Sequence, residues 1–556
     1  MNSEMKRKVI LWMAAFLMTA SAMAQVTPRV LGDKHAMVKV EQGKKYVLLP
    51  VQETEEIAAI AVLDNRNDMM QRLNVKLAID RVDYYVPYEL KGASLLDIEF
   101  HGDRRQKGAV GEFVCWKDIK FSDTFDTTNR EHFRPIYHHT PVYGWMNDPN
   151  GMFYKDGVWH LYYQWNPYGS QWENMHWGHS TSRDLIHWEA QPMALEPDWL
   201  GSIFSGSCVT NGNEVVAFYT SAGHHQTQSM AVSKDGGRTF VKYENNPIIT
   251  SSAPDFRDPK VFYHEGTSRW IMMLAVGQEM QIWSSANLKD WRKESSFGSE
   301  YGNHGGVWEC PDMLKIGNKW VLICNINPGG PFGGSATQYF VGDFDGKKFT
   351  CESMPKVTKW LDYGKDHYAT VSFYNAPENR CVVLAWMSNW QYANQVPTKQ
   401  YRSGNSIPRD LGLFKCGEET YVSVVPSKEM LALRGAKVKK PTEACEIVID
   451  VKSQAEIVLS NLKGEQVVLT YDGQKQTFCM DRTKSGDVGF SDAFPCVTEA
   501  PTYGQIKQLR LFIDRCSIEA FDAEGKMAMT NLVFPSEPYN NIKVKGGKAT
   551  IYEIKN

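Results

Sequence analysis

One stretch decides the fold: Trp145-Met146-Asn147-Asp148-Pro149-Asn150-Gly151, in which an acid lies between two asparagines. Two later stretches share its acid-then-proline character, Arg257-Asp258-Pro259 and Trp308-Glu309-Cys310-Pro311-Asp312. Each is followed by a short apolar run, a turn and a second apolar run, which is the pattern of a β-hairpin. The three acids therefore occupy similar places in separate copies of one structural unit.

Five such hairpins are predicted. They pair Met152–Tyr154 with Val158–Trp165, Cys208–Thr210 with Val215–Tyr219, Lys260–Tyr263 with Trp270–Val276, Met313–Ile316 with Trp320–Ile326, and Ala369–Tyr374 with Cys381–Met387. The polar residues just before them are 51 to 57 residues apart: Asp148, Ser205, Asp258, Glu309 and Asp366. A repeat of this length, with several strands per unit, predicts a five-bladed β-propeller. Because equivalent points of the first strands face the central axis, we expect the three acids of the motifs to meet at one end of it.

The regions on either side of this propeller, which we place at residues 134–436, are also predicted to be β structure. Short alternating runs predict a small β domain over residues 25–121, with one strand at Gly111–Trp116, and the polar residues 122–133 form a linker. Residues 437–556 hold further apolar runs between turns, which predict a β-sandwich. The fold class is therefore all-β: a five-bladed β-propeller followed by a β-sandwich, with an extra small N-terminal β domain.

The first 24 residues match a secretory signal peptide. A basic start, Lys6-Arg7-Lys8, precedes an apolar run at Val9–Met18 and a small-x-small site, Ala22-Met23-Ala24. The apolar run is shorter than the ~20 residues that a transmembrane helix needs, and no other segment is apolar enough to form a membrane span. We therefore expect export, to the periplasm or outside the cell, with cleavage near Ala24.

Composition excludes several classes of function. The net charge of −3 provides no basic surface for nucleic acid, and the 11 cysteines include no Cys-x-x-Cys pair. The paired histidines, His138-His139 and His224-His225, would point to opposite sides of a strand and so make poor ligand sets. The chain has no His-Glu-x-x-His, phosphate-loop or Gly-x-Ser-x-Gly motif. We expect no metal and no cofactor.

Two carboxylates on either side of a bond are the equipment for glycoside cleavage. One protonates the leaving oxygen, while the other attacks the anomeric carbon or activates water, depending on a separation that the sequence leaves open. Asn147 is expected to donate to Asp148, and Trp308 is expected to limit the solvation of Glu309. A single acid more often caps a turn, but three acids in matching places of one repeated unit favour a catalytic site.

Side chains near the acids are candidates for sugar binding. Most tryptophans of an all-β protein belong to the core, but Trp172 and Phe204 lie in loop-like sequence and are predicted to stack on sugar rings. Gln164 and Ser205 are predicted to bind hydroxyl groups because of their positions in the blades.

Taken together, the motifs resemble those of glycoside hydrolase family 32, the family of invertases, levanases and inulinases. The matching segments are Trp145–Gly151, Gln164–Pro167, Trp177-Gly178-His179, Phe204–Ser207, Phe256–Pro259, Trp308–Asp312 and Asp362–Ala369. The resemblance covers residues 134–556 and implies a five-bladed propeller followed by a β-sandwich. It implies that Asp148 is the nucleophile, Glu309 the general acid/base and Asp258 the transition-state stabiliser.

The same resemblance implies that groups at Asn147, Gln164, Trp172, Ser205 and Arg257 hold the terminal fructose. With neighbouring candidates added, the predicted substrate-binding set is Trp145, Met146, Asn147, Gln164, Trp172, Phe204, Ser205, Arg257, Asp366 and Trp390.

The sequence therefore predicts an exported retaining β-fructosidase that acts on fructans such as levan or inulin, or on sucrose, with release of fructose from chain ends as the preferred mode. An endo-acting fructanase and a fructosyltransferase stay open as alternatives, as does a non-catalytic fructan-binding protein. The Asn-Asp-Pro-Asn-Gly context disfavours an arabinan- or xylan-cleaving propeller. The N-terminal β domain resembles that of exported fructan-degrading proteins of gut Bacteroidetes; its role, the preferred linkage, protein partners, disulfides and oligomeric state are left open.

Overall fold

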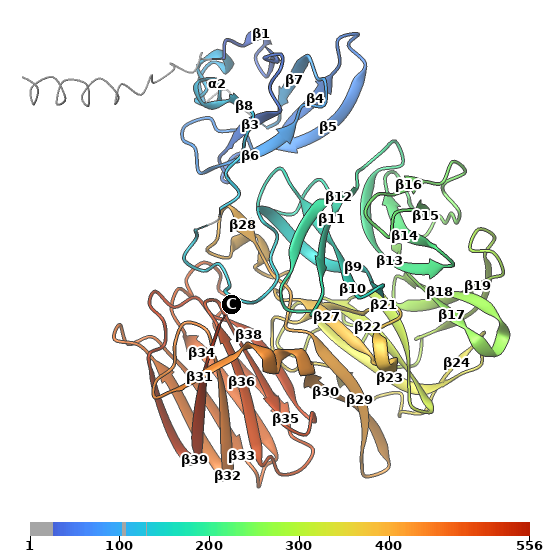
Figure 1. The fold of residues 1–556 in the computed structure, drawn as a ribbon, viewed down its shortest axis with the longest axis vertical. Coiled ribbons are helices and arrows are strands. Elements are labelled where there is room, and N and C mark those ends of the chain that lie inside the picture. The colour runs from blue at the N-terminus through green and yellow to red at the C-terminus, as the bar shows by residue number, and fades with distance from the viewer. Residues whose placement is uncertain (1–25, 103–106, 129, 556) are drawn as a thin grey trace, which may run out of the picture. The chain divides into compact units, whose positions relative to one another are not determined.

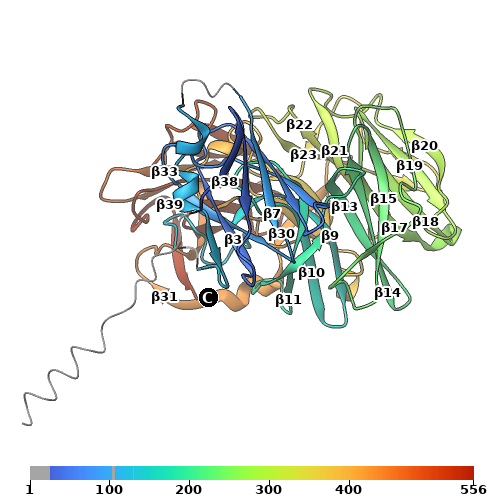
Figure 2. The same cartoon turned by 90° about the horizontal axis from the view of Figure 1, so that it is seen from above.

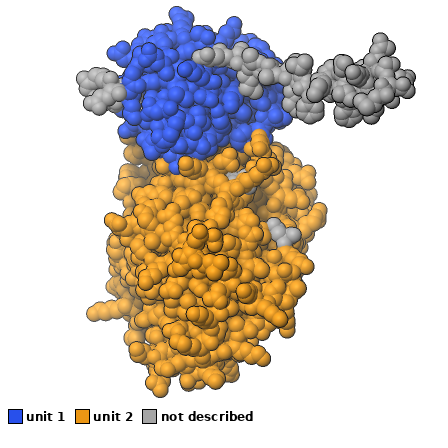
Figure 3. Space-filling view, turned by 90° about the vertical axis from the view of Figure 1, so that its left-hand side faces the viewer, with its two compact units in different colours: residues 1–125 blue, residues 126–556 orange. Residues whose placement is uncertain are grey.

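The computed structural model describes residues 26–102, 107–128 and 130–555. The chain divides after Phe125 into two compact units, which Figure 3 colours separately. The predicted signal peptide, residues 1–24, lies outside the described residues. Among the residues that are described, no helix is long and apolar enough to cross a membrane.

The first unit is a small β domain whose described strands form two sheets (Figure 1). Across the larger sheet the order is β1 (Arg29–Gly32), β2 (His35–Lys39), β7 (Leu95–Phe100), β4 (Ala58–Leu63) and β5 (Met69–Val75); across the smaller one it is β6 (Tyr84–Glu89), β3 (Tyr46–Val51) and β8 (Lys120–Ser122). The prediction of a strand at Gly111–Trp116 is wrong. This segment spans two helical turns, η1 (Val110–Glu112) and α2 (Cys115–Asp118), which bury Trp116 edge-on against Phe100 at 5.9 Å.

The second unit contains five successive sheets over residues 144–426, all of which are described (Figures 1 and 2). The first sheet contains β9 (Gly144–Lys155), β10 (Val158–Asn166), β11 (His176–Ser182) and β12 (Glu189–Leu195), and the second contains β13 (Ser202–Asn211), β14 (Glu214–Ala222), β15 (Gln226–Ser233) and β16 (Val241–Lys242). The third contains β17 (Phe256–His264), β18 (Arg269–Val276), β19 (Glu279–Ser285) and β20 (Arg292–Phe297), and the fourth contains β21 (Val307–Ile316), β22 (Lys319–Asn327), β23 (Ala336–Phe344), β24 (Phe349–Cys351) and β25 (Lys359–Trp360). The fifth contains β26 (Tyr368–Ser372), β27 (Val382–Trp386), β29 (Arg409–Cys416) and β30 (Glu419–Pro426). Short 3-10 turns are η2 (Glu265–Thr267), η3 (Pro377–Asn379), η4 (Ala393–Gln395) and η5 (Lys428–Leu433). The five predicted hairpins are confirmed.

The first strands of these sheets contact one another in a closed ring, in the order β9, β13, β17, β21, β26 and back to β9. The sheets radiate from this ring as the blades of a propeller do. A further strand, β28 (Tyr401–Arg402), pairs in parallel with the start of β9, so that Tyr401 lies opposite Gly144 and Arg402 opposite Trp145. This late segment pairs with the first two residues of β9.

Each strand of the ring carries a β-bulge near its start, at which two of its residues face one residue of the neighbouring strand. The bulged pairs are 147–148, 204–205, 258–259, 310–311 and 369–370. A bulge bends the strand and re-aims its side chains. It also tolerates proline, which explains Pro259 and Pro311 inside strands. The sequence suggests that Asp148, Asp258 and Glu309 come just before the first strands. In the structure they lie within these strands.

The C-terminal part of the second unit is a β-sandwich, and the predicted order of propeller and sandwich is confirmed. Its strands are β31 (Arg434–Val438), β32 (Cys445–Ser460), β33 (Gln466–Asp472), β34 (Thr477–Lys484), β35 (Val497–Pro501), β36 (Gln508–Asp514), β37 (Ser517–Asp522), β38 (Ala528–Leu532) and β39 (Asn541–Ile554). The long β32 pairs with β36 through residues 445–450 and with β33 through residues 454–460, while β39 follows both halves. The sheet thereby folds over a core that includes Ile447, Ile457 and Leu511.

A buried charged network joins the propeller to the sandwich. Arg409 of β29 forms ion pairs with Asp362 and with Glu519 of β37. The imidazole of His138 lies between Asp514 and Glu519, 2.8 Å from a carboxylate oxygen of each. Burial by itself would lower the pKa of His138, but the two carboxylates outweigh this effect and raise it to about 9.

His138 therefore makes the stability of the second unit depend on pH. A histidine with a raised folded-state pKa stabilises fully below its unfolded pKa of ~6.5, and this contribution is lost as pH rises through about 9. We expect the contribution to fall by roughly 3 kcal/mol over this window, measured by urea unfolding between about pH 6 and about pH 9.5. His138→Gln, which does not titrate, should lack this component. An equally steep decline in the variant would contradict the assignment.

Candidate active site

The three acids of the motifs meet at the bulged end of the ring, because Cys310 contacts two of them and Arg257 contacts the third. The Cys310 backbone N–H donates to Asp258 Oδ2 at 2.8 Å, and its thiol donates to Asp148 Oδ2 at 3.2 Å. Arg257 Nη2 donates to Glu309 Oε1 at 2.7 Å, and Arg257 Nε lies 3.9 Å from Asp258 Oδ2. Carboxylates from β9, β17 and β21 are thus gathered around two residues.

The acids reach this place from three different positions in their strands. Asp258 is the first bulged residue of β17, Asp148 is the second of β9, and Glu309 comes immediately before the bulge of β21. The spacing of the three acids in the sequence is therefore only approximately equal, and the bulges determine the direction in which their side chains point. Asp258 has a φ of 65°, a left-handed conformation that non-glycine residues rarely adopt, and Thr220 Oγ1 accepts its backbone N–H at 2.9 Å.

The Asp148 carboxylate is held from three directions. Asn147 Nδ2 donates to Oδ1 at 3.0 Å, as the sequence predicts, and Ser205 Oγ donates to Oδ2 at 2.6 Å, beside the Cys310 thiol. Trp145 Nε1 in turn donates to Asn147 Oδ1 at 2.7 Å and fixes the orientation of that amide. A partly exposed carboxylate with a fixed orientation is suited to attack on carbon.

The other two acids have raised proton affinity. Burial raises the pKa of Glu309 to about 7 and that of Asp258 to about 6. The guanidinium of Arg257 opposes both shifts, while the carboxylate of Asp148 adds to them, since close like charges disfavour joint ionisation. Tyr368 Oη donates to Glu309 Oε2, so both oxygens of Glu309 have partners. A carboxylic acid that keeps its proton near neutral pH is suited to general acid catalysis.

Trp308 does not shield Glu309, contrary to expectation. Successive residues of a strand point to opposite faces, and Trp308 is buried in the core between the third and fourth sheets, where His304 stacks on it at 4.9 Å. The contacts of the Glu309 carboxylate come instead from Arg257 and Tyr368.

Aromatic residues of the predicted binding set lie around the acids. Trp172 is 41% exposed, and its ring lies edge-to-face with Phe204 at 6.0 Å. Trp390 is partly buried and stacks on Trp145 at 5.7 Å. Gln164 is buried opposite the bulge of β9, and its side-chain amide donates to the carbonyl of Ile203 at 2.9 Å.

Trp145 and Met146 have no exposed surface, so they do not contact a substrate directly as predicted. Trp145 acts through its hydrogen bond to Asn147. Met146 packs into the apolar cluster that contains Leu161 and Phe373. Both residues belong to the motif because they support the strand that carries Asp148.

Asp366 is the third correction to the predicted binding set. It is completely buried and forms an ion pair with Arg482 of the sandwich. It also accepts hydrogen bonds from Tyr392 Oη at 2.5 Å and from the Leu532 N–H at 2.8 Å. Asp366 therefore joins the propeller to the sandwich, and its predicted role in substrate binding is wrong.

Asp366→Asn is expected to destabilise the protein by roughly 3–5 kcal/mol, because Arg482 would keep a buried charge without a counter-charge. The KM of the folded fraction should be unchanged. The matched control is Asp343→Asn, which breaks an ion pair with Lys319 at a carboxylate that is 71% exposed; it should cost at most about 1 kcal/mol. Thermal unfolding and initial rates measure both, and a raised KM at unchanged stability would restore the binding role.

Two residues of the site were not singled out from the sequence, although both lie inside the matching motifs. Cys310 follows Glu309 directly, and Tyr368 lies in the Asp362–Ala369 segment. Cysteine and tyrosine are common core residues in an all-β protein. Only the contacts of Cys310 with Asp148 and of Tyr368 with Glu309 identify these two residues as part of the site.

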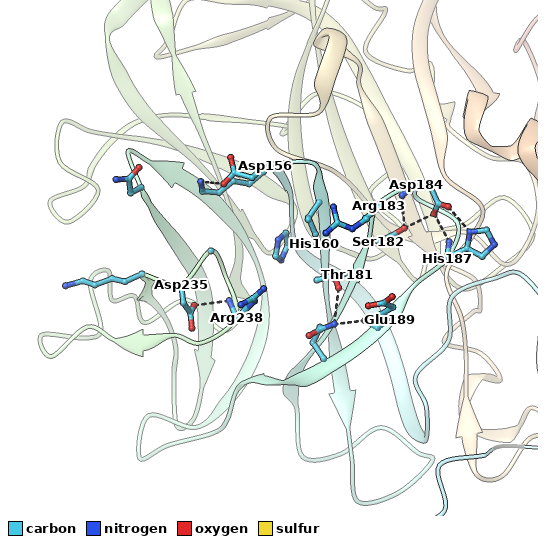
Figure 4. Close-up of a pocket in the computed structure, with 16 residues that line it drawn as sticks. Asp156, His160, Thr181, Ser182, Arg183, Asp184, His187, Glu189, Asp235 and Arg238 are labelled. Carbon is cyan, nitrogen blue, oxygen red and sulfur yellow. Dashed lines mark hydrogen bonds and ion pairs between the residues drawn. The ribbon is translucent and has the colours of Figure 1, made fainter.

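A concavity of about 810 Å³ lies at the other end of the first two sheets (Figure 4). Two of its acids cap their own turns: Asp184 Oδ1 accepts the His187 N–H at 2.9 Å, and Asp235 Oδ1 accepts the Thr239 N–H at 2.9 Å. These are turn caps rather than a catalytic pair. In the described part of the chain, no group of three or more His, Cys, Asp or Glu side chains is arranged to hold a metal ion, and the 11 cysteines are free.

Known families account for most of the chain. Residues 138–424 match the glycosyl hydrolases family 32 N-terminal domain, and residues 420–555 match the family 32 C-terminal domain. The chain belongs to glycosyl hydrolase family 32. Residues 32–137 match a domain of unknown function, DUF4980.

Individual relatives support the family 32 assignment. The levanase of Bacillus subtilis (strain 168) is 42% identical over 480 residues, which cover 76% of this chain and 71% of the levanase. The extracellular exo-inulinase inuE of Aspergillus ficuum is 36% identical over 484 residues, covering 73% of this chain and 90% of that protein. The crystal structure of exo-inulinase from Aspergillus awamori matches with a TM-score of 0.71 and 32% identity, over 78% of this chain and 100% of the other. The predicted resemblance to family 32 is thereby confirmed.

Proposed function

We propose that this family 32 hydrolase is an exported, retaining β-fructosidase that releases fructose from the ends of fructans and also cleaves sucrose. The observation that carries the proposal is the gathering of Asp148 and Asp258 on Cys310, with Glu309 held beside them by Arg257. Similar proteins named levanase and exo-inulinase support fructans as the substrate class.

In the first step, an Asp148 oxygen attacks the anomeric carbon of the terminal fructose. The bond from that carbon to the leaving oxygen breaks, and the leaving oxygen takes the proton of Glu309. In the second step, Glu309 as a carboxylate takes a proton from water, whose oxygen attacks the same carbon and displaces Asp148. The two displacements restore the enzyme and retain the configuration of the sugar.

Asp258 serves as the transition-state stabiliser in this scheme. It is fixed by its left-handed backbone and by the Cys310 N–H, so it does not need to move during the reaction. Hydrogen bonds from fructose hydroxyl groups to Asp258 would strengthen as oxocarbenium character develops, which is binding of the transition state in preference to the substrate.

Product analysis tests the mode of action. Incubation with levan, inulin and sucrose in parallel should release fructose alone at early times, as seen by chromatography; an early ladder of oligosaccharides would show endo action instead. The first anomer formed, followed by NMR, should be β-fructofuranose, and first formation of the α anomer would overturn retention.

Two rivals are separated by related measurements. A fructosyltransferase would lengthen acceptors at high sucrose, because sugar rather than water would intercept the fructosyl–enzyme. A non-catalytic binding protein would bind fructan without turnover.

The proposal of export rests on the signal-like start and on relatives named as extracellular. The mature N-terminus, determined by mass spectrometry, should begin near Gln25.

A further inference from the structure

We propose that Trp199 is a stacking platform for the part of a fructan chain that leaves on cleavage, and that it favours longer substrates over sucrose. The proposal rests on the proposed function. Trp199 is 84% exposed. Single exposed apolar residues are common on protein surfaces, but the Trp199 loop is held by hydrogen bonds and lies against a second loop that contacts the site.

The Trp199 loop is held by hydrogen bonds, although the Trp199 ring is exposed. The turn is closed by the Gly201 N–H, which donates to the Asp198 carbonyl at 3.0 Å, and by the Leu200 N–H, which donates to Asp198 Oδ1 at 2.8 Å. Lys242 Nζ of the neighbouring β16 donates to Asp198 Oδ2 at 2.7 Å. An aromatic ring on a fixed turn gives up little conformational entropy when a ligand stacks on it.

This loop joins β12 to β13 and meets the loop that joins β14 to β15. Gly201 has a φ of 119°, and a Cβ added there would meet the carbonyl oxygen of Ala222 at 2.3 Å, so the two loops are in close contact. The second loop carries the exposed imidazoles of His224 and His225, whose centres are 4.5 Å apart. Together with Trp199 they provide exposed rings on two touching loops.

Contacts continue from the second loop to the acids. Gln226, at its end, accepts hydrogen bonds from the Phe256 N–H at 2.9 Å and from Arg257 Nη1 at 3.3 Å. The other terminal nitrogen of Arg257 binds Glu309. The ring-bearing loops are therefore connected to the acid that would protonate the leaving oxygen.

The contact of these loops with Arg257 indicates which part of the substrate Trp199 would bind. The leaving part of the chain begins at the oxygen that Glu309 protonates, so its further sugars extend outward from the Glu309 side of the site. The flat C–H faces of those sugars match the face of an indole ring. In sucrose, the leaving group is a single sugar beside Glu309, whereas a fructan has further sugars, which the proposal places over the Trp199 loop.

Rates on short and long substrates test the platform. Trp199→Ala should raise KM for a fructan tetrasaccharide about tenfold with little change in kcat, which is the size of one aromatic stacking contact. Activity on sucrose should stay within about twofold, and Trp199→Phe should restore most of the loss. Leu462→Ala is the control for removal of an exposed apolar group, because Leu462 is 88% exposed on a turn of the sandwich. Equal losses on sucrose and tetrasaccharide, or no loss on either, would overturn the proposal.

A binding measurement separates this proposal from the proposed function. In the Asp148→Asn background, Trp199→Ala should raise the Kd for the tetrasaccharide about tenfold in calorimetric titration, and should leave the Kd for sucrose unchanged. If the unaltered enzyme cleaved no fructan, the proposed function would fail, but this titration would still decide the platform. An unchanged Kd for the tetrasaccharide would reject it.

Discussion

Asp148→Asn is expected to lower kcat by about 10⁴-fold or more, because an amide does not form the covalent fructosyl–enzyme. The substitution keeps the shape of the side chain, and Ser205 and Cys310 remain as neighbours. Substrate binding should therefore persist while both displacements stop. Initial rates on sucrose and on inulin measure the loss.

Two controls make the Asp148 result specific. The unfolding midpoint of Asp148→Asn should match that of the unaltered enzyme, since the carboxylate is not part of the buried network between propeller and sandwich. Rapid quenching of the unaltered enzyme with substrate should give a peptide that carries a fructosyl group on Asp148, detected by mass spectrometry. A variant that kept more than about a tenth of the activity would remove Asp148 from the role of nucleophile.

Glu309→Gln is expected to lower kcat on sucrose by about 10²–10⁴-fold, because the leaving oxygen would receive no proton. The loss in the first step should be smaller for an aryl fructoside, whose leaving oxygen needs little protonation. Single-turnover release of the aryl group measures that first step alone. An equal loss for both substrates would argue against Glu309 as the acid.

The same residue sets a direction for the pH dependence. Only the protonated form of Glu309 can act as the acid, and its pKa is raised to about 7. Activity on sucrose should therefore decline as pH rises above about 7 and be retained just below it. Tyr368 donates to the carboxylate and favours its ionised form. Tyr368→Phe should accordingly move the decline to higher pH as well as lower kcat, and an unmoved limb would limit Tyr368 to packing.

The repeated hairpins are predictable from the sequence because their signals are local. Apolar runs with short polar turns between them, as at Met152–Tyr154 and Val158–Trp165, specify neighbouring strands without reference to the rest of the chain. The convergence of Asp148, Asp258 and Glu309 then follows from their place in each repeat. Closing the repeats into a ring requires only that each first strand meets the next.

The errors arise where the deciding partner is distant or the backbone is irregular. Asp366 resembles the other acids of the repeat, but Arg482 and Tyr392 bind it from remote segments. The bulges have no simple sequence signal, so the sequence places Asp148 and Asp258 before the strands rather than within them. Trp145 and Trp308 come before the bulges and lie on the buried face of their strands, and which face is buried depends on tertiary packing. Tertiary contacts and two-for-one registers thus outweigh the local pattern.

The pairing of β28 with the start of β9 has a consequence for the order in which the parts of the enzyme are made. The strand β9, which carries the proposed nucleophile Asp148, leaves the ribosome about 250 residues before β28, the strand that pairs with its start. Pairings between segments so far apart form slowly, and an uncovered edge is open to wrong partners until they form. A translation product that ends before Tyr401 would hold all three acids with their immediate contacts and still lack the strand that pairs with the start of β9. The three acids are synthesised early, and the strand that supports the start of β9 follows late.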